Sequence, residues 1–133
     1  MTIAYATEDY LGADEYIDIV RKSGLNRPIE DRGRVERMLA HANLILTARQ
    51  DGRLVGFARS LTDFCFCCYL SDLAVDKACQ GQGIGKRLIE ETRTAAGGAL
   101  TTTLLLSAPT AMTFYQGIKM PNADNCFLYR RKR

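Results

Sequence analysis

The sequence predicts a mixed α/β protein, with helices packed on a central sheet. Helix-like and strand-like periodicities alternate along its 133 residues. The pair Asp51-Gly52 joins two strand-like runs, which is typical of a tight hairpin. Residues 69–88 read YLSDLAVDKACQGQGIGKRL, a strand-like run, a loop with three glycines and a helix-like run. A chain of this length usually forms one domain, so we expect a single domain over residues 1–133.

The first half of the chain carries one strand, two helices and a hairpin. Ile17 and Val20 lie three residues apart, which indicates an amphipathic helix, and the glycine and proline of residues 23–28 end it. Alternating apolar residues on both sides of the Asp-Gly turn indicate two paired strands. The expected elements are a strand at 2–6, helices at 14–22 and 31–42, and strands at 44–49 and 54–61.

The second half continues with a long strand, the glycine loop and a helix that Gly97 and Gly98 end. The β-branched and leucine-rich run that follows suggests a central strand covered on both faces. Pro109 suits the first turn of the next helix. The expected elements are a strand at 63–76, a helix at 84–96, a strand at 101–107, a helix at 109–117, and strands near 117–120 and 126–130.

Composition argues against several classes of protein. The net charge of +3 is mild and concentrated in residues 130–133, so a solvated tail is a better interpretation than a nucleic-acid site. A nucleic-acid-associated protein that uses this basic tail stays open as a rival. We find no N-terminal signal pattern and no apolar run long enough to span a bilayer, so no membrane association is expected.

The cysteines suggest a reducing compartment. Five is an odd number, and Cys65, Cys67 and Cys68 are too close together for a disulfide framework. A cytoplasmic location follows. The C-F-C-C run lacks paired C-x-x-C spacing and has no histidine nearby, so we expect no metal site and interpret these cysteines as buried small hydrophobes.

The glycine loop is the strongest functional signal. Its glycines run G-x-G-x-G, which fits neither the G-x-G-x-x-G dinucleotide fingerprint nor the Walker loop. A strand, a glycine loop and a helix N-terminus together favour a pyrophosphate or similar anion, because the first helical amides are unpaired and the helix dipole is positive there. The pattern that does fit is Q-x-x-G-x-G, formed by Gln80, Gly83 and Gly85.

This loop resembles the acetyl-CoA pyrophosphate loop of the GNAT superfamily of N-acetyltransferases. The resemblance extends over about residues 44–118, through DGRLVGFARS, YLSDLAVD, TTTLLLSAP and AMTFYQGI in the family's order. It implies a mixed, mostly antiparallel sheet of six to seven strands, flanked by about four helices in the order β-α-α-β-β-β-α-β-α-β-β. It also implies acetyl-CoA as cosubstrate. The implied cofactor contacts are the backbone of Leu73, Ala74 and Val75 along the pantetheine arm, and Gln80, Gly81, Gln82, Gly83, Ile84, Gly85 and Lys86 around the diphosphate.

The family's activity requires a proton donor for the leaving thiolate and a neutral attacking amine. Tyr115, in the position where relatives commonly carry the general acid, is the candidate donor, since a phenol can protonate a nascent thiolate. Asp72 is the candidate base; a structural hydrogen-bond acceptor and a water relay stay open as alternatives. The resemblance predicts direct transfer to a primary amine in a ternary complex, with a small-molecule or protein acceptor. A catalytically inactive acyl-CoA sensor or scaffold is the rival, and a homodimer is possible.

Overall fold

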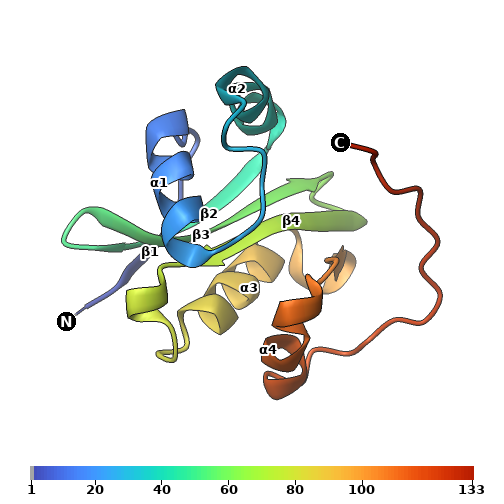
Figure 1. Ribbon diagram of the computed structural model, residues 1–133. Coiled ribbons are helices and arrows are strands. Elements are labelled where there is room, and N and C mark those ends of the chain that lie inside the picture. Colours follow the sequence, from blue (N-terminus) through green and yellow to red (C-terminus); the bar gives the residue numbers. More distant parts are fainter. Residues whose placement is uncertain (1) are drawn as a thin grey trace.

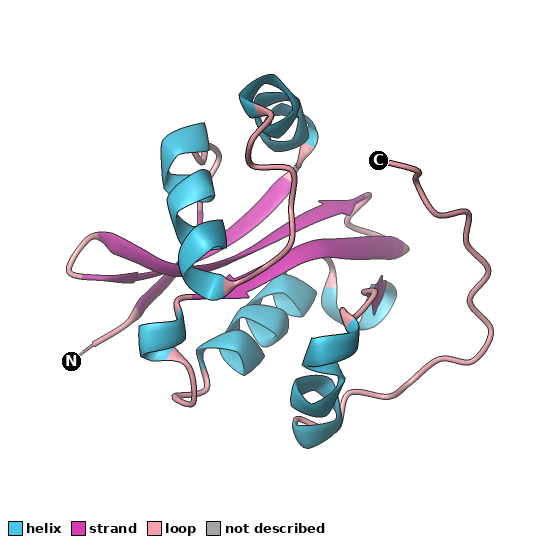
Figure 2. Ribbon diagram, in the orientation of Figure 1, coloured by secondary structure: helices cyan, strands magenta, loops and turns pink. Residues whose placement is uncertain are grey.

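The computed structural model describes residues 2–133 (Figure 1). The fold is built on a five-stranded sheet with the strand order β1-β2-β3-β4-β5. Met1, the first residue of the predicted domain, lies outside the described residues. The strands are β1 (Ala4–Thr7), β2 (Leu44–Gln50), β3 (Arg53–Thr62), β4 (Cys67–Val75) and β5 (Thr102–Leu104). The α-helices are α1 (Ala13–Ser23), α2 (Arg32–His41), α3 (Ile84–Ala95) and α4 (Met112–Gly117). Short 3-10 turns lie at Lys77–Cys79, Gly98–Leu100 and Pro109–Ala111 (Figure 2).

The pairing of the strands confirms the predicted fold class. Strands β1 to β4 are antiparallel neighbours in chain order, and β5 pairs in parallel with β4. The β2–β3 hairpin turns at Asp51 and Gly52, whose φ angles are 53° and 80°. Positive φ at both turn positions matches the right-handed twist of the two strands, and Asp-Gly tolerates it well.

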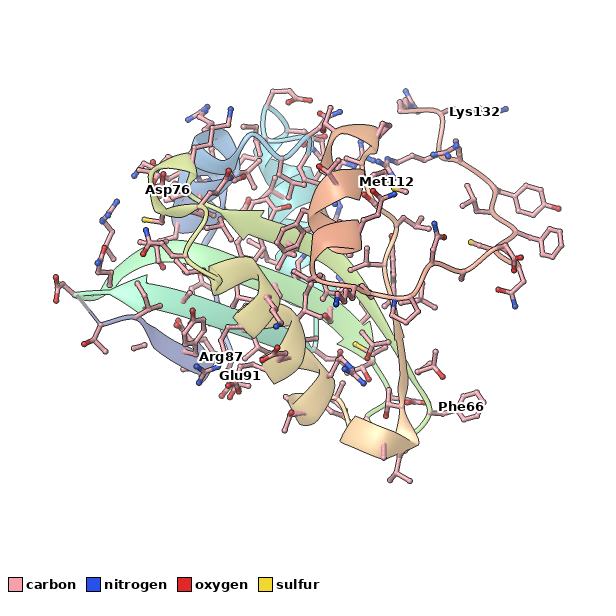
Figure 3. The ribbon with its side chains drawn as sticks, turned by 90° about the horizontal axis from the view of Figure 1, so that it is seen from below. Phe66, Asp76, Arg87, Glu91, Met112 and Lys132 are labelled. Atoms are coloured by element: carbon pink, nitrogen blue, oxygen red, sulfur yellow. The ribbon has the colours of Figure 1, made fainter. Side chains whose placement is uncertain are left out.

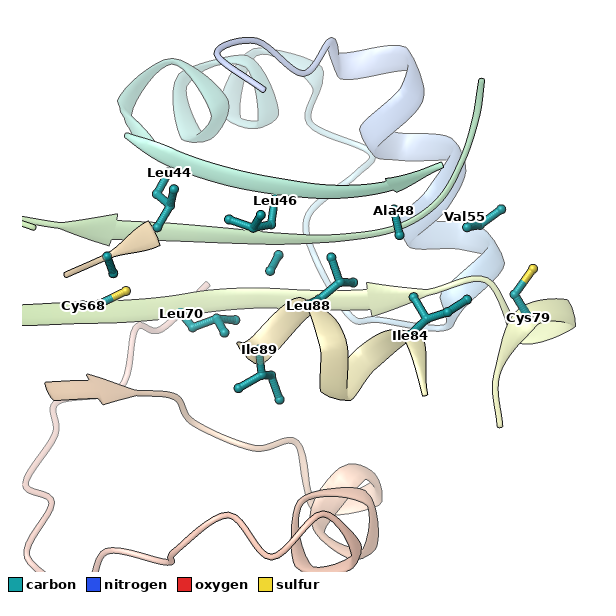
Figure 4. Close-up of a cluster of buried hydrophobic side chains, with 12 residues drawn as sticks. Leu44, Leu46, Ala48, Val55, Cys68, Leu70, Cys79, Ile84, Leu88 and Ile89 are labelled. Atoms are coloured by element: carbon teal, nitrogen blue, oxygen red, sulfur yellow. The ribbon is translucent and has the colours of Figure 1, made fainter. Parts of the chain in front are cut away.

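The two faces of the sheet each carry their own core. Helices α1 and α2 cover one face, and α3 and α4 cover the other (Figure 1). On the first face the rings of Tyr16 and Phe57 lie 5.3 Å apart, centroid to centroid, among buried aliphatic side chains. On the second face Leu88 lies fully buried, between the sheet and α3, in the cluster that Figure 4 shows. The sheet therefore holds both layers in place by burying apolar side chains on both sides.

A β-bulge in β4 changes which face its side chains meet. Arg59 is paired with Asp72 and Ser60 with Leu70, which leaves Ser71 as the extra residue. Leu70 therefore belongs to the α3 core, whereas Ala74 belongs to the α1 core. Without the bulge, residues four apart on a strand would share a face. The bulge turns the side chain of Asp72 toward α1, where its oxygen meets Tyr16.

The two predicted C-terminal strands are wrong. Residues 118–133 contain neither helix nor strand, so the sheet of the described chain has five strands rather than six or seven. The tail leaves α4 and arches away from the sheet to end near α2 (Figure 1), where Arg34 Nη2 donates to the Arg133 main-chain oxygen at 3.0 Å. In the part of the chain that the structure describes, residues 126–130 pair with no strand, and Phe127 and Tyr129 are almost fully exposed. The run at 101–107 was expected to be covered on both faces, but β5 is short and largely exposed.

Two further features concern the cysteines and the membrane. Of the C-F-C-C cysteines, Cys68 is buried as expected, but Cys65 and Cys67 are exposed, because they lie at the β3–β4 turn and at the start of the strand. Cys79, for which no burial was predicted, is also buried. Within residues 2–133, no group of three or more candidate metal-ligating side chains comes together. In the same part of the chain, no helix combines the length and the apolarity needed to cross a bilayer.

Candidate functional site

The glycine loop is tied firmly to the end of β4. Asp76 caps the Lys77–Cys79 turn by accepting a hydrogen bond from the Ala78 amide at 2.9 Å (Asp76 is labelled in Figure 3). The side chain of Gln80 donates to the Val75 carbonyl at 3.0 Å. Gly81 and Gly83 then adopt φ angles of 82° and 83°, where an L side chain is strained. A Cβ at either position would meet nothing within 4 Å, so conformation rather than space requires glycine there.

Six consecutive amides at the start of α3 are free. The first helical hydrogen bond runs from the Arg87 amide to the Gly83 carbonyl at 3.0 Å. Within residues 2–133, the amides of residues 81–86 have no acceptor on the protein. Unpaired amides and the positive end of the helix dipole converge here, as they do at anion sites. The sequence prediction for residues 81–86 therefore coincides with a row of available donors.

Two cationic side chains, Lys86 and Arg87, lie in the first turn of α3 next to the glycine loop. Lys86 is exposed, and its Nζ lies 3.9 Å from Glu90 Oε1 one turn along the helix. The side chain of Arg87, labelled next to Glu91 in Figure 3, is already engaged: its Nε donates to Glu91 Oε1 at 2.7 Å, and its guanidinium covers the ring of Tyr5. Of the two cations in the first turn, Lys86 is the one whose side chain is free to reach a ligand on the loop.

The edge of β4 that faces β5 is open over most of its length. β4 and β5 pair only through Cys67–Tyr69 and Thr102–Leu104, and within residues 2–133 no other strand covers that edge. The Asp76 amide donates to Val55 on β3 at 2.9 Å. Because main-chain groups alternate along a strand, Ala74 also faces β3, while Leu73 and Val75 face the open edge. Of the three predicted backbone contacts, Leu73 presents a free amide and carbonyl and Val75 a free amide, since Gln80 occupies the Val75 carbonyl and the groups of Ala74 belong to the β3 ladder.

Tyr115 lies on α4 and packs against the same core cluster as Leu73 and Val75. Its ring is half-buried and packs edge-on against Phe114, with centroids 5.0 Å apart. In the described chain its hydroxyl has no hydrogen-bond partner. Burial raises the pKa of Tyr115, and the charge of Arg27 lowers it in part. A phenol that stays protonated and has no protein partner is able to donate a proton.

Asp72, the candidate base, is fully buried and heavily occupied. Its Oδ2 accepts from Tyr16 Oη at 2.8 Å and from Arg59 Nε at 2.6 Å. Its Oδ1 accepts from Arg27 Nε at 2.7 Å. Burial alone would raise the pKa of Asp72, but the hydrogen bonds and charges of Arg59 and Arg27 outweigh it and keep that pKa below its usual value. A carboxylate held by two guanidiniums and a phenol has little capacity left to take a proton from an amine.

Asp63, the other carboxylate near this strand, is occupied as well. Three amides, of Cys65, Phe66 and Cys67, donate to its Oδ1 at 2.8–3.0 Å and lower its pKa to about 2. It closes the turn between β3 and β4 and stands away from the glycine loop.

The sequence reasoning missed three residues around Asp72: Tyr16, Arg27 and Arg59. Arg59 offered a signal, because it lies two residues after Phe57 and so on the same buried face of β3, where a lone charge demands a partner. Tyr16 and Arg27 lie 56 and 45 residues from Asp72, and nothing in their local sequence points to it.

Fold and geometry define a class: an α/β protein with unpaired amides at a helix N-terminus beside an open strand edge. A sequence profile of the acetyltransferase (GNAT) domain matches residues 22–118, most of the chain. The chain therefore belongs to the GNAT acetyltransferase family. No curated protein sequence matches it.

Solved structures share the fold. A GNAT-family acetyltransferase of Streptococcus pneumoniae superposes with a TM-score of 0.78 at 19% identity, covering 99% of this chain and 100% of that one. A Staphylococcus aureus protein gives a TM-score of 0.79 at 18% identity, covering 98% and 99%. The aminoglycoside N-acetyltransferase AAC(6')-Iy, in complex with CoA, gives a TM-score of 0.70 at 15% identity, covering 99% and 96%. At these identities the likeness concerns the fold alone.

Proposed function

We propose that the chain is an acetyl-CoA-dependent N-acetyltransferase that acts on a primary amine by direct attack in a ternary complex. The observation that carries the proposal is the row of unpaired amides at residues 81–86, next to the free edge of β4. Coenzyme A combines a diphosphate with an extended amide-containing arm. The row of amides suits the diphosphate, and the free edge of β4 suits the arm. The structural neighbour AAC(6')-Iy is described in complex with CoA, which supports the assignment.

Most of the predicted cofactor contacts keep a role in this proposal. The amides of residues 81–86 bind the diphosphate, and Lys86 adds a positive charge. The amide and carbonyl of Leu73 and the amide of Val75 hold the pantetheine arm as an added strand would be held. Acetyl-CoA supplies the activated acetyl thioester, and the transfer leaves a thiolate that needs a proton.

Tyr115 donates that proton from its hydroxyl, and the opening between β4 and β5 is where the amine meets it. The amine's own proton leaves through water, because the oxygens of Asp72 are engaged by Tyr16, Arg27 and Arg59. In this proposal Asp72 fixes the position of Arg27 and does not serve as the base.

Calorimetry with coenzyme A tests the binding step. Gly83→Asp places a carboxylate among the amides and a side chain at φ 83°, so we expect binding to be lost. Gly52→Asp is a matched control, because Gly52 also has a positive φ (80°) and open space, but lies in the β2–β3 turn. Equal affinity for coenzyme A in the two variants would contradict the proposed site.

An amine panel with acetyl-CoA, followed by release of free thiol, tests the reaction. We expect acceptor-dependent release from the unaltered chain. Coenzyme A binding without release for any amine would instead support the inactive sensor or scaffold. Loss of nucleic-acid binding on removal of residues 130–133, with no acetyl transfer at all, would support the nucleic-acid alternative.

A further inference from the structure

A groove of about 380 Å³ lies where β4 and β5 part, and its wall is basic. Tyr69 and Leu106 form the side that belongs to the two strands, and residues 128–133 of the tail form the other. The tail contributes Arg130, Arg131, Lys132 and Arg133, and Lys132 is labelled in Figure 3. No aspartate or glutamate side chain lines the groove in residues 2–133. Its chemistry therefore favours an anion.

A second positive charge lies further along the same strand. Two guanidiniums, of Arg27 and Arg59, share the single carboxylate of Asp72, which leaves one positive charge uncompensated. Arg59 is buried, whereas the Arg27 side chain is 20% exposed. Its Nη2 donates to the Ser71 carbonyl at 2.6 Å, two residues along β4 from Tyr69. The excess charge thus reaches the surface at Arg27.

The two basic features lie along the same stretch of β4. Arg27 donates to the Asp72 carboxylate and to the Ser71 carbonyl, so its charge lies on β4 two to three residues beyond Tyr69. The groove begins at Tyr69, the last residue of β4 that pairs with β5. An amine bound at the edge of β4 next to Tyr69 therefore lies close to both Arg27 and the basic tail.

We propose that the acceptor amine also carries a carboxylate, as an amino acid or a peptide with a free C-terminus does, and that the basic groove binds this carboxylate. The inference rests on the proposed acetyl transfer and narrows it. It also distinguishes the chain from the aminoglycoside acetyltransferases that share its fold, since a polycationic acceptor would face cations on both sides.

The test compares acceptors that differ only in charge. Free thiol release is measured with L-leucine, L-leucinamide and isoamylamine, with the other amino acids as free acids and amides, and with tripeptides that have a free or an amidated C-terminus. Sisomicin, spermidine and phosphoethanolamine complete the panel. We expect the best free acid to exceed its amide about tenfold in kcat/KM, with sisomicin and spermidine below both.

Charge reversal locates the effect. Arg130→Glu with Arg131→Glu is expected to raise the KM of the best free acid about tenfold, while kcat and the KM of acetyl-CoA stay within about twofold. Arg21→Glu with Arg93→Glu is the matched control, because it changes the net charge equally at exposed sites on α1 and α3 without touching the groove. We expect that variant to match the unaltered chain.

Three outcomes would overturn the inference. If amides or polycations are acetylated as efficiently as free acids, the inference of a carboxylate on the acceptor is wrong, and the proposed acetyl transfer is unaffected. Phosphoethanolamine preferred over every free acid would replace the carboxylate with a phosphate. No thiol release with any member of the panel would remove both the inference and the proposed function.

Discussion

In our proposal, removal of the Tyr115 hydroxyl impairs the chemical step and leaves coenzyme A binding intact. Tyr115→Phe keeps the ring that packs on Phe114 and deletes only the hydroxyl, which has no protein partner in the described chain. We expect kcat to fall about 100-fold, since a positioned proton donor contributes on that order, with the affinity for coenzyme A unchanged. Steady-state thiol release and calorimetry measure the two quantities.

Tyr10→Phe is the control, because Tyr10 is exposed and lies before α1. It should leave both quantities unchanged. A kcat for Tyr115→Phe within twofold of the unaltered chain would remove Tyr115 from the mechanism and leave it a packing residue of α4.

Asp72 governs stability more than catalysis in our proposal. Asp72→Asn leaves two guanidiniums without their anion, and breaking a buried ion pair in this way typically costs about 3–5 kcal/mol of unfolding free energy. Asp14→Asn, whose partner Arg32 is exposed, should cost far less, because solvent screens a surface ion pair. Urea unfolding measures both variants. A large loss of kcat at unchanged stability would instead make Asp72 the base.

The pH dependence of stability has a definite sign at this residue. The pKa of Asp72 is lower in the folded chain than in the unfolded one, where it is about 3.9. The stabilisation is therefore fully present above the unfolded pKa and is lost as the pH falls below about 4 toward the folded pKa. The unaltered chain should lose unfolding free energy in that range more steeply than Asp72→Asn. Parallel curves for the two proteins would show that the ionised carboxylate adds no stability.

At the scale of single residues, the sequence predicted those parts of the candidate site that a local pattern determines. The glycines and Gln80 stand in one short motif, so their positions followed from spacing alone. The partners of Asp72 are brought together by tertiary packing and by the bulge at Ser71, which turns the aspartate toward α1. The alternation of apolar and polar residues along a strand does not reveal a one-residue change of register. From the sequence, a structural role for Asp72 as a hydrogen-bond acceptor was therefore only one alternative to its role as the base.

At the scale of helices and strands, the close contact between α3 and α4 can be tested directly. A Cβ on Gly85 would lie 2.9 Å from Cζ of Phe114, closer than two such atoms can be. Gly85→Ala should therefore displace Phe114 and with it Tyr115, the next residue of α4. Because Cζ is the outer end of a partly exposed ring that is able to shift, we expect a loss of unfolding free energy at the low end of the roughly 1–3 kcal/mol typical of overpacking, and a several-fold lower kcat.

Phe114→Leu in the same chain is the matched rescue, because a shorter side chain makes room for the new methyl group. The double variant should recover part of both losses, which a double-mutant cycle on unfolding and on kcat would reveal. Strictly additive effects would mean that Gly85 does not act through Phe114.

The elements themselves divide into those that local sequence determines and those that need a neighbour. The hairpin around Asp51-Gly52 and the helix after the glycine loop carry their own turn and capping signals, and both were predicted within a few residues. Residues 126–130 form a short apolar run of the kind found in strands, but a strand forms only where another edge accepts its hydrogen bonds. In the described chain β5 is three residues long and the tail lies apart from it, so the pattern produces no strand.

Across the whole molecule, the order of elements from β1 to α4 agrees with the predicted order, and the disagreement is confined to the tail. The single domain over residues 1–133 and the homodimer both stay predictions. The tail carries the exposed side chains of Phe127 and Tyr129 and also forms one wall of the basic groove.

Coenzyme A should alter hydrogen exchange in two ways at once. The amides of residues 81–86, Leu73 and Val75 have no protein acceptor on the open side, so they should exchange fast in the free protein and slow on binding. Ala74 already faces β3 and should show no such local change. Amides that exchange only through global unfolding, such as those of central β3, should slow about 100-fold at a ligand concentration 100 times Kd, because the ligand binds the folded state alone. Exchange by mass spectrometry or NMR measures both effects. Slowing in β3 without protection at residues 81–86 would place the ligand elsewhere on the fold.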